Sequence, residues 1–325
     1  MNILVTGATG FLGFRLCQTL KEKGYCVFGA GRNEKKGELL LKEGISFLKF
    51  DLRNKNAVSK AVEGKDVVIH CGGLSSPWGK RKDFLDINDK GTYSIAQFSK
   101  EKGVKRFIFI SSPSIYHTPN DRLNIKESDP LTTNPLTYYI ESKIKAESSA
   151  LKAFPESILL RPRAIYGPGD DAIFPRLIRA HHKGRLKKIG HGQNFTDLTY
   201  VDNVVEAILN CLTSDERSFG QAFNITDGQP QKLWFLLDHV FSKLGLKIQT
   251  GSVPYSLAYR MSFLNEAIHK WLLLNREPVL TRYTCNLLSK SQTLDITKAR
   301  EVLGYKPKVT TLRGIDLFLK DYKDE

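Results

Sequence analysis

A glycine-rich loop close to the amino terminus constrains this chain more than any other feature. The apolar residues 3–6 lead into glycines spaced GxxGxxG, and a helical pattern covers residues 11–21. A strand, a tight turn and a helix start direct backbone amides and the helix dipole at an anion, and a side chain on these glycines would obstruct that approach. The loop predicts a dinucleotide pyrophosphate site lined by Gly7, Thr9, Gly10, Phe11, Leu12 and Gly13.

The first half of the chain alternates short apolar runs with segments of helical periodicity. Strands separated by helices predict βαβ units, and the lack of polar alternation indicates a parallel sheet that is covered on both faces. We therefore expect an α/β fold with a doubly wound parallel (Rossmann) sheet. Its strands are predicted at residues 3–6, 27–29, 45–50, 67–70, 107–110 and 158–160.

Beyond Tyr166 the alternation becomes less regular. A helix is expected at residues 173–182 and strands at 198–201 and 222–225, and the C-terminal stretch from residue 233 is helical, basic and apolar by turns. We interpret its apolar residues at helical spacing mainly as core. The expected organisation is a dinucleotide-binding domain, 1–165 plus about 195–228, interleaved with a smaller α/β substrate lobe, about 166–194 plus 229–325.

Composition excludes several other classes of protein. A chain of 325 residues with 41% apolar residues is too long for a disulfide-stapled module and has ample core material. Its five cysteines form no CxxC pair, which argues against a disulfide framework or a structural metal site. No apolar run approaches the ~20 residues of a membrane span, and no signal peptide precedes the first strand. We expect a soluble, cytoplasmic protein.

The net charge of +15 is spread over the chain, with +8 in residues 1–150 and +7 in residues 151–325. The densest basic segment, residues 176–188, contains six Lys or Arg residues, two His residues and no carboxylate. It is either a solvated helix end and turn or a contact for a substrate phosphate or a membrane surface. The segment has no aromatic platform for bases, and the C-terminal lobe adds Arg260, Lys270 and Arg276. We expect weak peripheral contact with anionic membranes and no specific binding of nucleic acid.

The end of the second predicted strand bears on which dinucleotide binds. An NAD site normally has a carboxylate there for the ribose hydroxyls, whereas this chain has Gly31 followed by Arg32. An arginine fork suits a 2′-phosphate, so NADP(H) is the preferred cofactor and NAD(H) the alternative. Arg32 could instead only cover the adenine. Asp51, after the third strand, is placed to accept from the adenine amino group, or is an ordinary helix cap.

Tyr139 and Lys143 form the expected centre of the chemistry. They are four residues apart in a predicted helix and therefore share one face. A phenol of pKa near ~10 is a poor acid-base catalyst at neutral pH, and a neighbouring ammonium should lower that pKa. The pair predicts proton transfer by Tyr139, tuned by Lys143.

These motifs resemble the short-chain dehydrogenase/reductase superfamily in its extended, epimerase/dehydratase branch. The segments at 160–170, 197–203 and 303–307 are similar to the 3β-hydroxysteroid dehydrogenase-like family, and Ser112-Pro113-Ser114 with residues 277–282 resembles its bacterial 2-alkyl-3-oxoalkanoate reductase branch. The resemblance implies a catalytic Ser112, four residues before Tyr116, which positions the substrate oxygen. It implies a helix-shaping or proton-relay role for Asn88, although a purely structural role is equally open. It also places Leu52, Cys71, Gly72, Gly73, Tyr139, Lys143 and Pro162 beside the cofactor.

Three functions follow in order of preference. The first is an oxidoreductase that moves a hydride between the nicotinamide and a hydroxyl or keto carbon of a hydrophobic substrate of the 3β-hydroxysteroid, sterol or β-keto acid type. The second is a nucleotide-sugar epimerase or dehydratase, and the third a non-catalytic dinucleotide-binding regulator or RNA-binding relative. The expected partners are a small-molecule substrate and, in a homodimer, a second copy of the chain.

Overall fold

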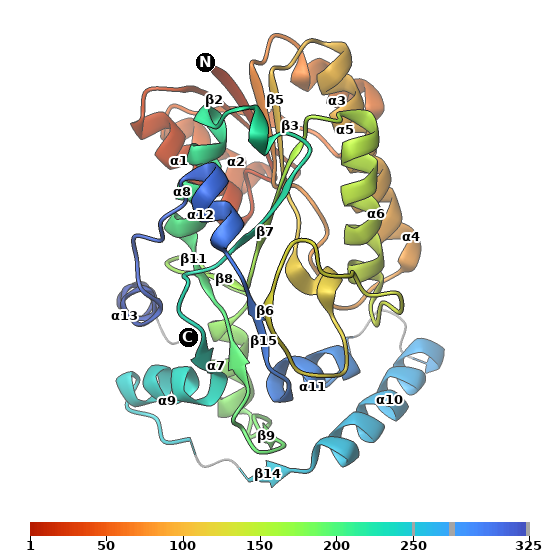
Figure 1. Ribbon diagram of the computed structural model, residues 1–325, viewed down its shortest axis with the longest axis vertical. Coiled ribbons are helices and arrows are strands. Elements are labelled where there is room, and N and C mark those ends of the chain that lie inside the picture. Colours follow the sequence, from red (N-terminus) through yellow and green to blue (C-terminus); the bar gives the residue numbers. More distant parts are fainter. Residues whose placement is uncertain (249–250, 273–276, 323–325) are drawn as a thin grey trace.

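A seven-stranded parallel sheet forms the centre of the computed structural model, which describes residues 1–248, 251–272 and 277–322 (Figure 1). The strands lie in the order β12-β7-β5-β4-β1-β2-β3. Successive strands are added outward in one direction from β1 and in the other from β4, and ligands bind at such a switch point. The predicted doubly wound fold is confirmed. The strands are β1 (Asn2–Thr6), β2 (Cys26–Gly31), β3 (Ser46–Lys49), β4 (Val67–His70), β5 (Arg106–Ile110), β7 (Ile158–Pro162) and β12 (Ala222–Ile225).

Helices cover both faces of this sheet, with α1 and α8 on one face and α3, α5 and α6 on the other (Figure 1). Alternate residues of β1 enter the two cores, Ile3 and Val5 on one side and Leu4 on the other. This burial on both faces explains why the strands are apolar throughout. The helices are α1 (Phe11–Glu22), α2 (Glu34–Lys42), α3 (Lys55–Val62), α4 (Arg81–Phe84), α5 (Gly91–Glu101), α6 (Tyr138–Ala153) and α8 (Val201–Thr213).

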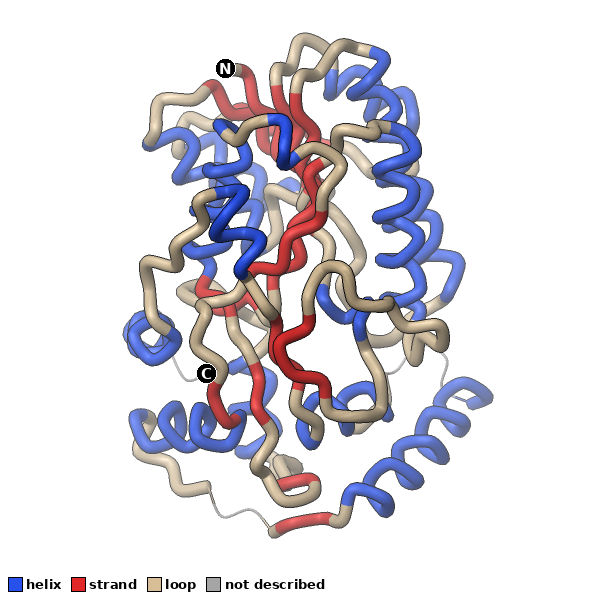
Figure 2. Tube along the Cα trace, viewed as in Figure 1, coloured by secondary structure: helices blue, strands red, loops and turns tan. Residues whose placement is uncertain are grey.

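Short strands and further helices lie beyond the carboxyl edge of the large sheet (Figure 2). They form a four-stranded sheet of order β13-β10-β15-β6 and the pairs β11-β8 and β14-β9. The strands are β6 (Arg122–Ile125), β8 (Ile165–Tyr166), β9 (Lys188–Ile189), β10 (Phe195–Thr196), β11 (Thr199–Tyr200), β13 (Gln231–Lys232), β14 (Ser252–Val253) and β15 (Gln292–Leu294). The helices there are α7 (Phe174–His182), α9 (Leu233–Lys243), α10 (Tyr255–Leu272), α11 (Arg282–Ser289) and α13 (Thr311–Asp321), whereas α12 (Thr297–Leu303) packs beside the large sheet.

The chain crosses repeatedly between its two regions. The strands β6 and β10, both assigned to the dinucleotide-binding part from the sequence, hydrogen-bond in the four-stranded sheet with β15. In return α12, from the predicted substrate lobe, contacts α8 and β12 of the large sheet. The division into two domains stays a prediction, and these pairings describe the interleaving more finely.

Two local expectations differ from the structure. The strand predicted at residues 198–201 is shorter, because Val201 already begins α8. The apolar residues of α10 were expected to be core, but Met261, Leu264 and Trp271 are exposed. Arg276, named above as a basic residue of the C-terminal lobe, lies outside the described residues. Within the described residues, no helix is long and apolar enough to cross a bilayer.

Candidate active site

The glycine loop forms a narrow cradle between β1 and the backbone that follows β4. Gly7 adopts a φ of +69°, and a Cβ at this position would lie 2.8 Å from the Gly72 Cα. Gly10 begins α1 without a side-chain cap, whereas Asn33 and Asn54 cap α2 and α3 with their side chains. The first-turn amides of α1 are thus left for another acceptor. The cradle fits the pyrophosphate of a dinucleotide.

The other predicted cofactor residues surround this cradle. Cys71, Gly72 and Gly73 follow β4, and Pro162 ends β7 at the same edge of the sheet. Leu52 lies against Gly72, since a Cβ there would be 3.3 Å from the Leu52 Cδ1. Phe11 and Leu12, the last predicted cofactor residues before Gly13, are the first two residues of α1. The structure therefore brings the residues expected from local motifs and from the resemblance to one edge.

Two arginines lie at the Asp51 carboxylate, Arg32 after β2 and Arg53 after β3, where the sequence indicated only Arg32. Arg32 is exposed, with its guanidinium 3.9 Å from the Asp51 carboxylate. Arg53 holds the same carboxylate at 2.8 and 2.9 Å, and this hydrogen bonding lowers the pKa of Asp51 below its ordinary value. Asp51, predicted to meet the adenine, is already engaged by Arg53.

The absence of a carboxylate at position 31 also has a steric cause. A Cβ on Gly31 would lie 2.6 Å from the Thr9 Oγ1. Any side chain at the end of β2 would collide with the phosphate loop unless Thr9 moved. Close packing against Thr9 is therefore a reason of its own for a glycine at position 31.

Ser112 and Tyr139 meet beside the end of β5. Ser112 follows this strand at the start of a 3₁₀ turn, where its Oγ donates to the Ser114 Oγ at 3.0 Å. Tyr139 lies in the first turn of α6, which Thr137 caps by accepting from the Ile140 amide at 3.2 Å. The Ser112 hydroxyl lies close enough to the Tyr139 phenol to act on the pKa of Tyr139.

Lys143 lies one turn further along α6 and is 7% exposed. Its Nζ donates to the Ile110 carbonyl at 2.8 Å and lies 4.7 Å from the centre of the Phe109 ring. Burial lowers the pKa of Lys143 to about 8. A buried ammonium with donors to spare suits the hydroxyls of a ribose.

The expected lowering of the Tyr139 pKa by Lys143 is wrong for this structure. Burial raises the pKa of Tyr139 to about 12, and Tyr283 adds to the rise. Removal of the phenolate from water outweighs the opposing effect of the Ser112 hydroxyl on this pKa. Tyr139 is consequently a protonated phenol at neutral pH.

The Asn88 side chain links two segments of the site through hydrogen bonds. It lies in a π-helical turn (Leu85–Lys90), accepts from the Leu74 amide at 2.6 Å and donates to the Ser142 Oγ at 2.9 Å. These contacts tie the cofactor loop after β4 to the helix that carries Tyr139. The contacts of the Asn88 side chain thus agree with a structural duty.

Two sets of residues were missed by the sequence analysis. Tyr283, on α11, is close enough to Tyr139 to raise the pKa of Tyr139. It is also close enough to Arg163 for that guanidinium to act on the pKa of Tyr283. The buried pair Glu147 and Arg161 joins α6 to β7, with Oε to guanidinium distances of 2.6 and 2.8 Å. Tyr283 comes from a distant part of the chain and Arg161 lies 14 positions from Glu147, so no local motif identifies either contact.

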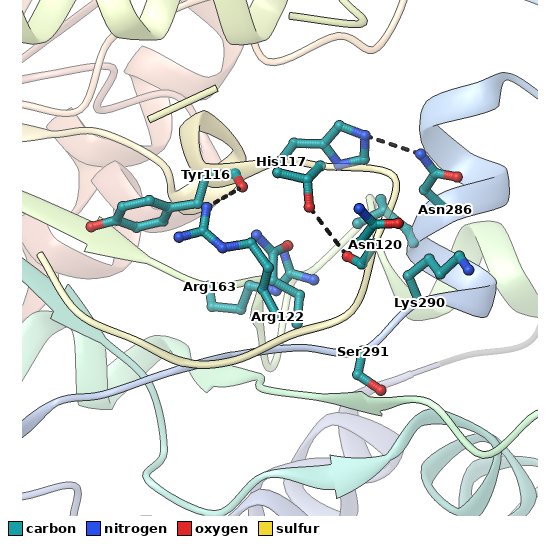
Figure 3. Close-up of a pocket in the computed structure, with 11 residues that line it drawn as sticks. Tyr116, His117, Asn120, Arg122, Arg163, Asn286, Lys290 and Ser291 are labelled. Carbon is teal, nitrogen blue, oxygen red and sulfur yellow. Dashed lines mark hydrogen bonds between the residues drawn. The ribbon is translucent and has the colours of Figure 1, made fainter. Parts of the chain in front are cut away.

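A smaller and a larger cavity lie near the short strands, α10 and α11, and neither is lined by Ser112, Tyr139 or Lys143. Figure 3 shows the smaller one, about 10 Å³, between the loop at 116–122 and α11. It receives Arg122, Arg163 and Lys290, and no carboxylate lines it among the described residues. The larger cavity, about 480 Å³, borders Tyr138, the neighbour of Tyr139. Its walls come from residues 77–84, 134–138, α10 and the start of α11.

Comparison with known proteins identifies the family. The family described as "NAD dependent epimerase/dehydratase family" matches residues 3–226. The chain belongs to this family. It is an extended short-chain dehydrogenase/reductase of the 3β-hydroxysteroid dehydrogenase-like branch, and an enzyme of that type.

The similar proteins fall into two groups. The 2-alkyl-3-oxoalkanoate reductase of Shewanella oneidensis is 31% identical, over 97% of this chain and 84% of its own. The sterol-4-alpha-carboxylate 3-dehydrogenase of Mus musculus is 29% identical over 98% and 90%. Among solved structures, the UDP-glucuronic acid 4-epimerase of Bacillus cereus in complex with NAD has a TM-score of 0.77, at 24% identity over 99% and 98%. That structural likeness concerns the fold.

Proposed function

We propose that this enzyme interconverts a keto group and a hydroxyl group on a hydrophobic substrate, with NADP(H) as the hydride carrier. The observation that carries the proposal is the meeting of Ser112, Tyr139 and Lys143 at the carboxyl edge of the sheet, beside the glycine cradle. The nicotinamide, when bound, supplies or accepts the hydride. The residues of the chain hold the substrate oxygen and move its proton.

The raised pKa of Tyr139 keeps available the proton that reduction consumes. A phenol that stays protonated at neutral pH donates its proton to the oxygen of a carbonyl as that carbon is reduced. Ser112 holds the same oxygen by a hydrogen bond, and the Lys143 cation stabilises negative charge that develops on Tyr139. Oxidation of an alcohol would first require the phenolate.

The larger cavity supports a substrate with an apolar body. Its walls combine apolar and aromatic groups with charged ones, in which Arg81 pairs with Glu141 and Arg282 with Glu266, in a volume of about 480 Å³. The printed names of relatives include an alkyl-oxoalkanoate reductase and a sterol carboxylate dehydrogenase. Both names describe molecules with a large apolar part. The cavity residues in question are Pro77, Trp78, Phe84, Leu136, Lys80, Arg81, Lys270 and Arg282.

Substitution of the phenol tests the mechanism. Tyr139→Phe should abolish reduction of a β-keto acid or 3-ketosteroid, since the proton donor is lost, while cofactor binding changes little. Ser112→Ala should be milder, with the loss of one hydrogen bond of about 1 to 3 kcal/mol in the transition state. Turnover is followed by nicotinamide absorbance. Wild-type turnover by Tyr139→Phe, or exclusive turnover of UDP-sugars by the wild type, would contradict the proposal.

The NADP(H) preference rests on the exposed guanidinium of Arg32 and on the second arginine, Arg53, beside it. Calorimetric titration should show tighter NADPH than NADH binding by the wild type. Arg32→Ala should weaken NADPH binding by about 1 to 3 kcal/mol and NADH binding far less, because only the former carries the 2′-phosphate. Lys23→Ala, an exposed cation at the far end of α1, is the control. Equal losses for both cofactors would refute the assignment.

A further inference from the structure

Helix α10 presents its apolar side to solvent instead of to the protein. The residues that face inward are small or paired: Ala258, Ser262 and Glu266 are buried, and Glu266 accepts from the Arg282 amide at 2.6 Å and from its Nε at 2.9 Å. The outward residues follow a spacing of four and three along the helix, which makes one continuous stripe. This apolar stripe consists of Leu257, Met261, Leu264, Ile268, Trp271 and Leu272, all at least half exposed.

The exposure is too large and too ordered for scattered surface residues. Trp271 is 86% exposed and Leu264 is 61% exposed, on a helix of 18 residues. Phe263 and Val279, at 53% and 66%, widen the apolar area. Contiguous apolar patches on soluble surfaces mark contact with another surface.

Charge on and around the stripe is positive. Arg260 and Lys270 are exposed on α10, and the only carboxylate of this helix, Glu266, is buried against Arg282. The loop between α7 and β9 adds the exposed Lys183, Arg185 and Lys187. Because β9 pairs with β14, and β14 leads directly into α10, this basic loop adjoins the same edge of the molecule (Figure 1).

We propose that α10 is an interfacial helix that docks this protein on an anionic lipid surface. Its apolar stripe enters the boundary between headgroups and acyl chains, and the flanking cations bind the headgroups. A second copy fits less well, because a two-fold pairing of α10 would bring Arg260 and Lys270 together with their equivalents and with no exposed carboxylate of that helix. The proposal does not depend on the proposed reductase activity.

Docking in this manner has a consequence for access. Lys270 lines the larger cavity beside Arg81 and Tyr138, and Trp78 of its wall stacks edge-on against His269 of α10 with ring centres 6.5 Å apart. The membrane-bound helix therefore places this cavity next to the lipid phase.

Vesicle flotation with paired variants tests the proposal. The wild type should float with phosphatidylcholine vesicles that contain about 30% phosphatidylserine, at about 0.05 M salt, and should bind at least tenfold more weakly at about 0.5 M salt. The double substitution Leu264→Asp with Ile268→Asp should reduce binding at least tenfold. Leu39→Asp with Leu41→Asp changes two exposed leucines of α2 equally and should bind as the wild type does.

A second measurement starts from the unsubstituted protein. Brominated phosphatidylserine should quench the tryptophan fluorescence of the wild type, and Trp271→Phe should remove most of that quenching. Three outcomes would overturn the proposal: no binding of the wild type to anionic vesicles, undiminished binding by the α10 double variant, or a dimer on light scattering that this variant alone dissociates and that excludes vesicles.

Discussion

At the scale of single residues, we predict that Lys143 sets the alkaline limit of the proposed reduction. Its pKa is lowered to about 8 by burial, while that of Tyr139 is raised to about 12. As the pH rises through 8, Lys143 loses its proton first and the cationic fraction falls. Reduction should decline about tenfold per pH unit above pH 8, because only the cation stabilises developing phenolate.

A pH profile of kcat/KM for the reduction measures this decline. Lys143→Arg provides the control, because a guanidinium stays charged throughout the accessible range. Whatever its absolute rate, its profile should be flat between pH 8 and 10. A wild-type profile that is flat over the same range would show that the proton on Lys143 does not matter.

Local spacing predicted which residues meet at the site but not the energies of their meeting. The i to i+4 relation of Tyr139 and Lys143 follows from helix geometry, so the sequence is sufficient for it. The depth at which α6 buries them depends on the whole fold, and this burial reverses the expected pKa shift of Tyr139. The contact of Gly31 with Thr9 is likewise invisible in a sequence, since 22 positions separate them.

At the scale of elements, one buried ion pair joins α6 to β7. Glu147 binds Arg161 of β7, and the Arg161 guanidinium also donates to the Tyr116 hydroxyl at the end of the turn that follows Ser112. Helix, strand and serine loop therefore share one junction. Loss of the carboxylate leaves a buried cation without its partner, which costs several kcal/mol.

Glu147→Gln should accordingly lower the free energy of unfolding by about 3 kcal/mol. The matched control is Glu156→Gln, whose pair with Lys100 is exposed and should contribute less than about 1 kcal/mol. Urea denaturation followed by circular dichroism measures both. Equal changes in the two variants would mean that the junction does not stabilise the fold.

Elements of the large sheet were predictable because each repeats a local pattern. Apolar runs gave the strands β1, β4 and β5 close to their observed limits. The four-stranded sheet was not predicted, because its strands are two to four residues long and come from residues as distant as 122 and 294. On α10, periodicity revealed an apolar face but not that this face points outward.

At the scale of the whole molecule, Asp227 connects the large sheet to the end of the chain. Its carboxylate accepts from the Tyr200 amide at 2.8 Å, the Asn203 Nδ2 at 2.7 Å, the Tyr166 hydroxyl at 3.0 Å and the Thr311 Oγ1 at 3.2 Å. It thereby joins β8, α8 and α13. Several buried donors depend on this one side chain.

Asp227→Ala should lower the free energy of unfolding by at least about 2 kcal/mol, because these donors lose their acceptor. Asp215→Ala is the control, since Asp215 pairs with Arg217 on the surface and should change stability by less than about 0.5 kcal/mol. Thermal unfolding monitored by calorimetry compares the two. A loss no greater than that of the control would show that α13 is held by other contacts.

The pairing of early strands with late ones affects how this protein folds during its synthesis on a ribosome. The first five strands of the large sheet can associate early. The strand β6 can pair with β15 only after some 170 further residues have been synthesised, and Asp227 can accept its hydrogen bond from Thr311 only after Thr311 has been added. Nascent domains generally fold as units in the order of synthesis. Here the earlier unit has to stay incomplete, with one segment unpaired, until translation has almost finished.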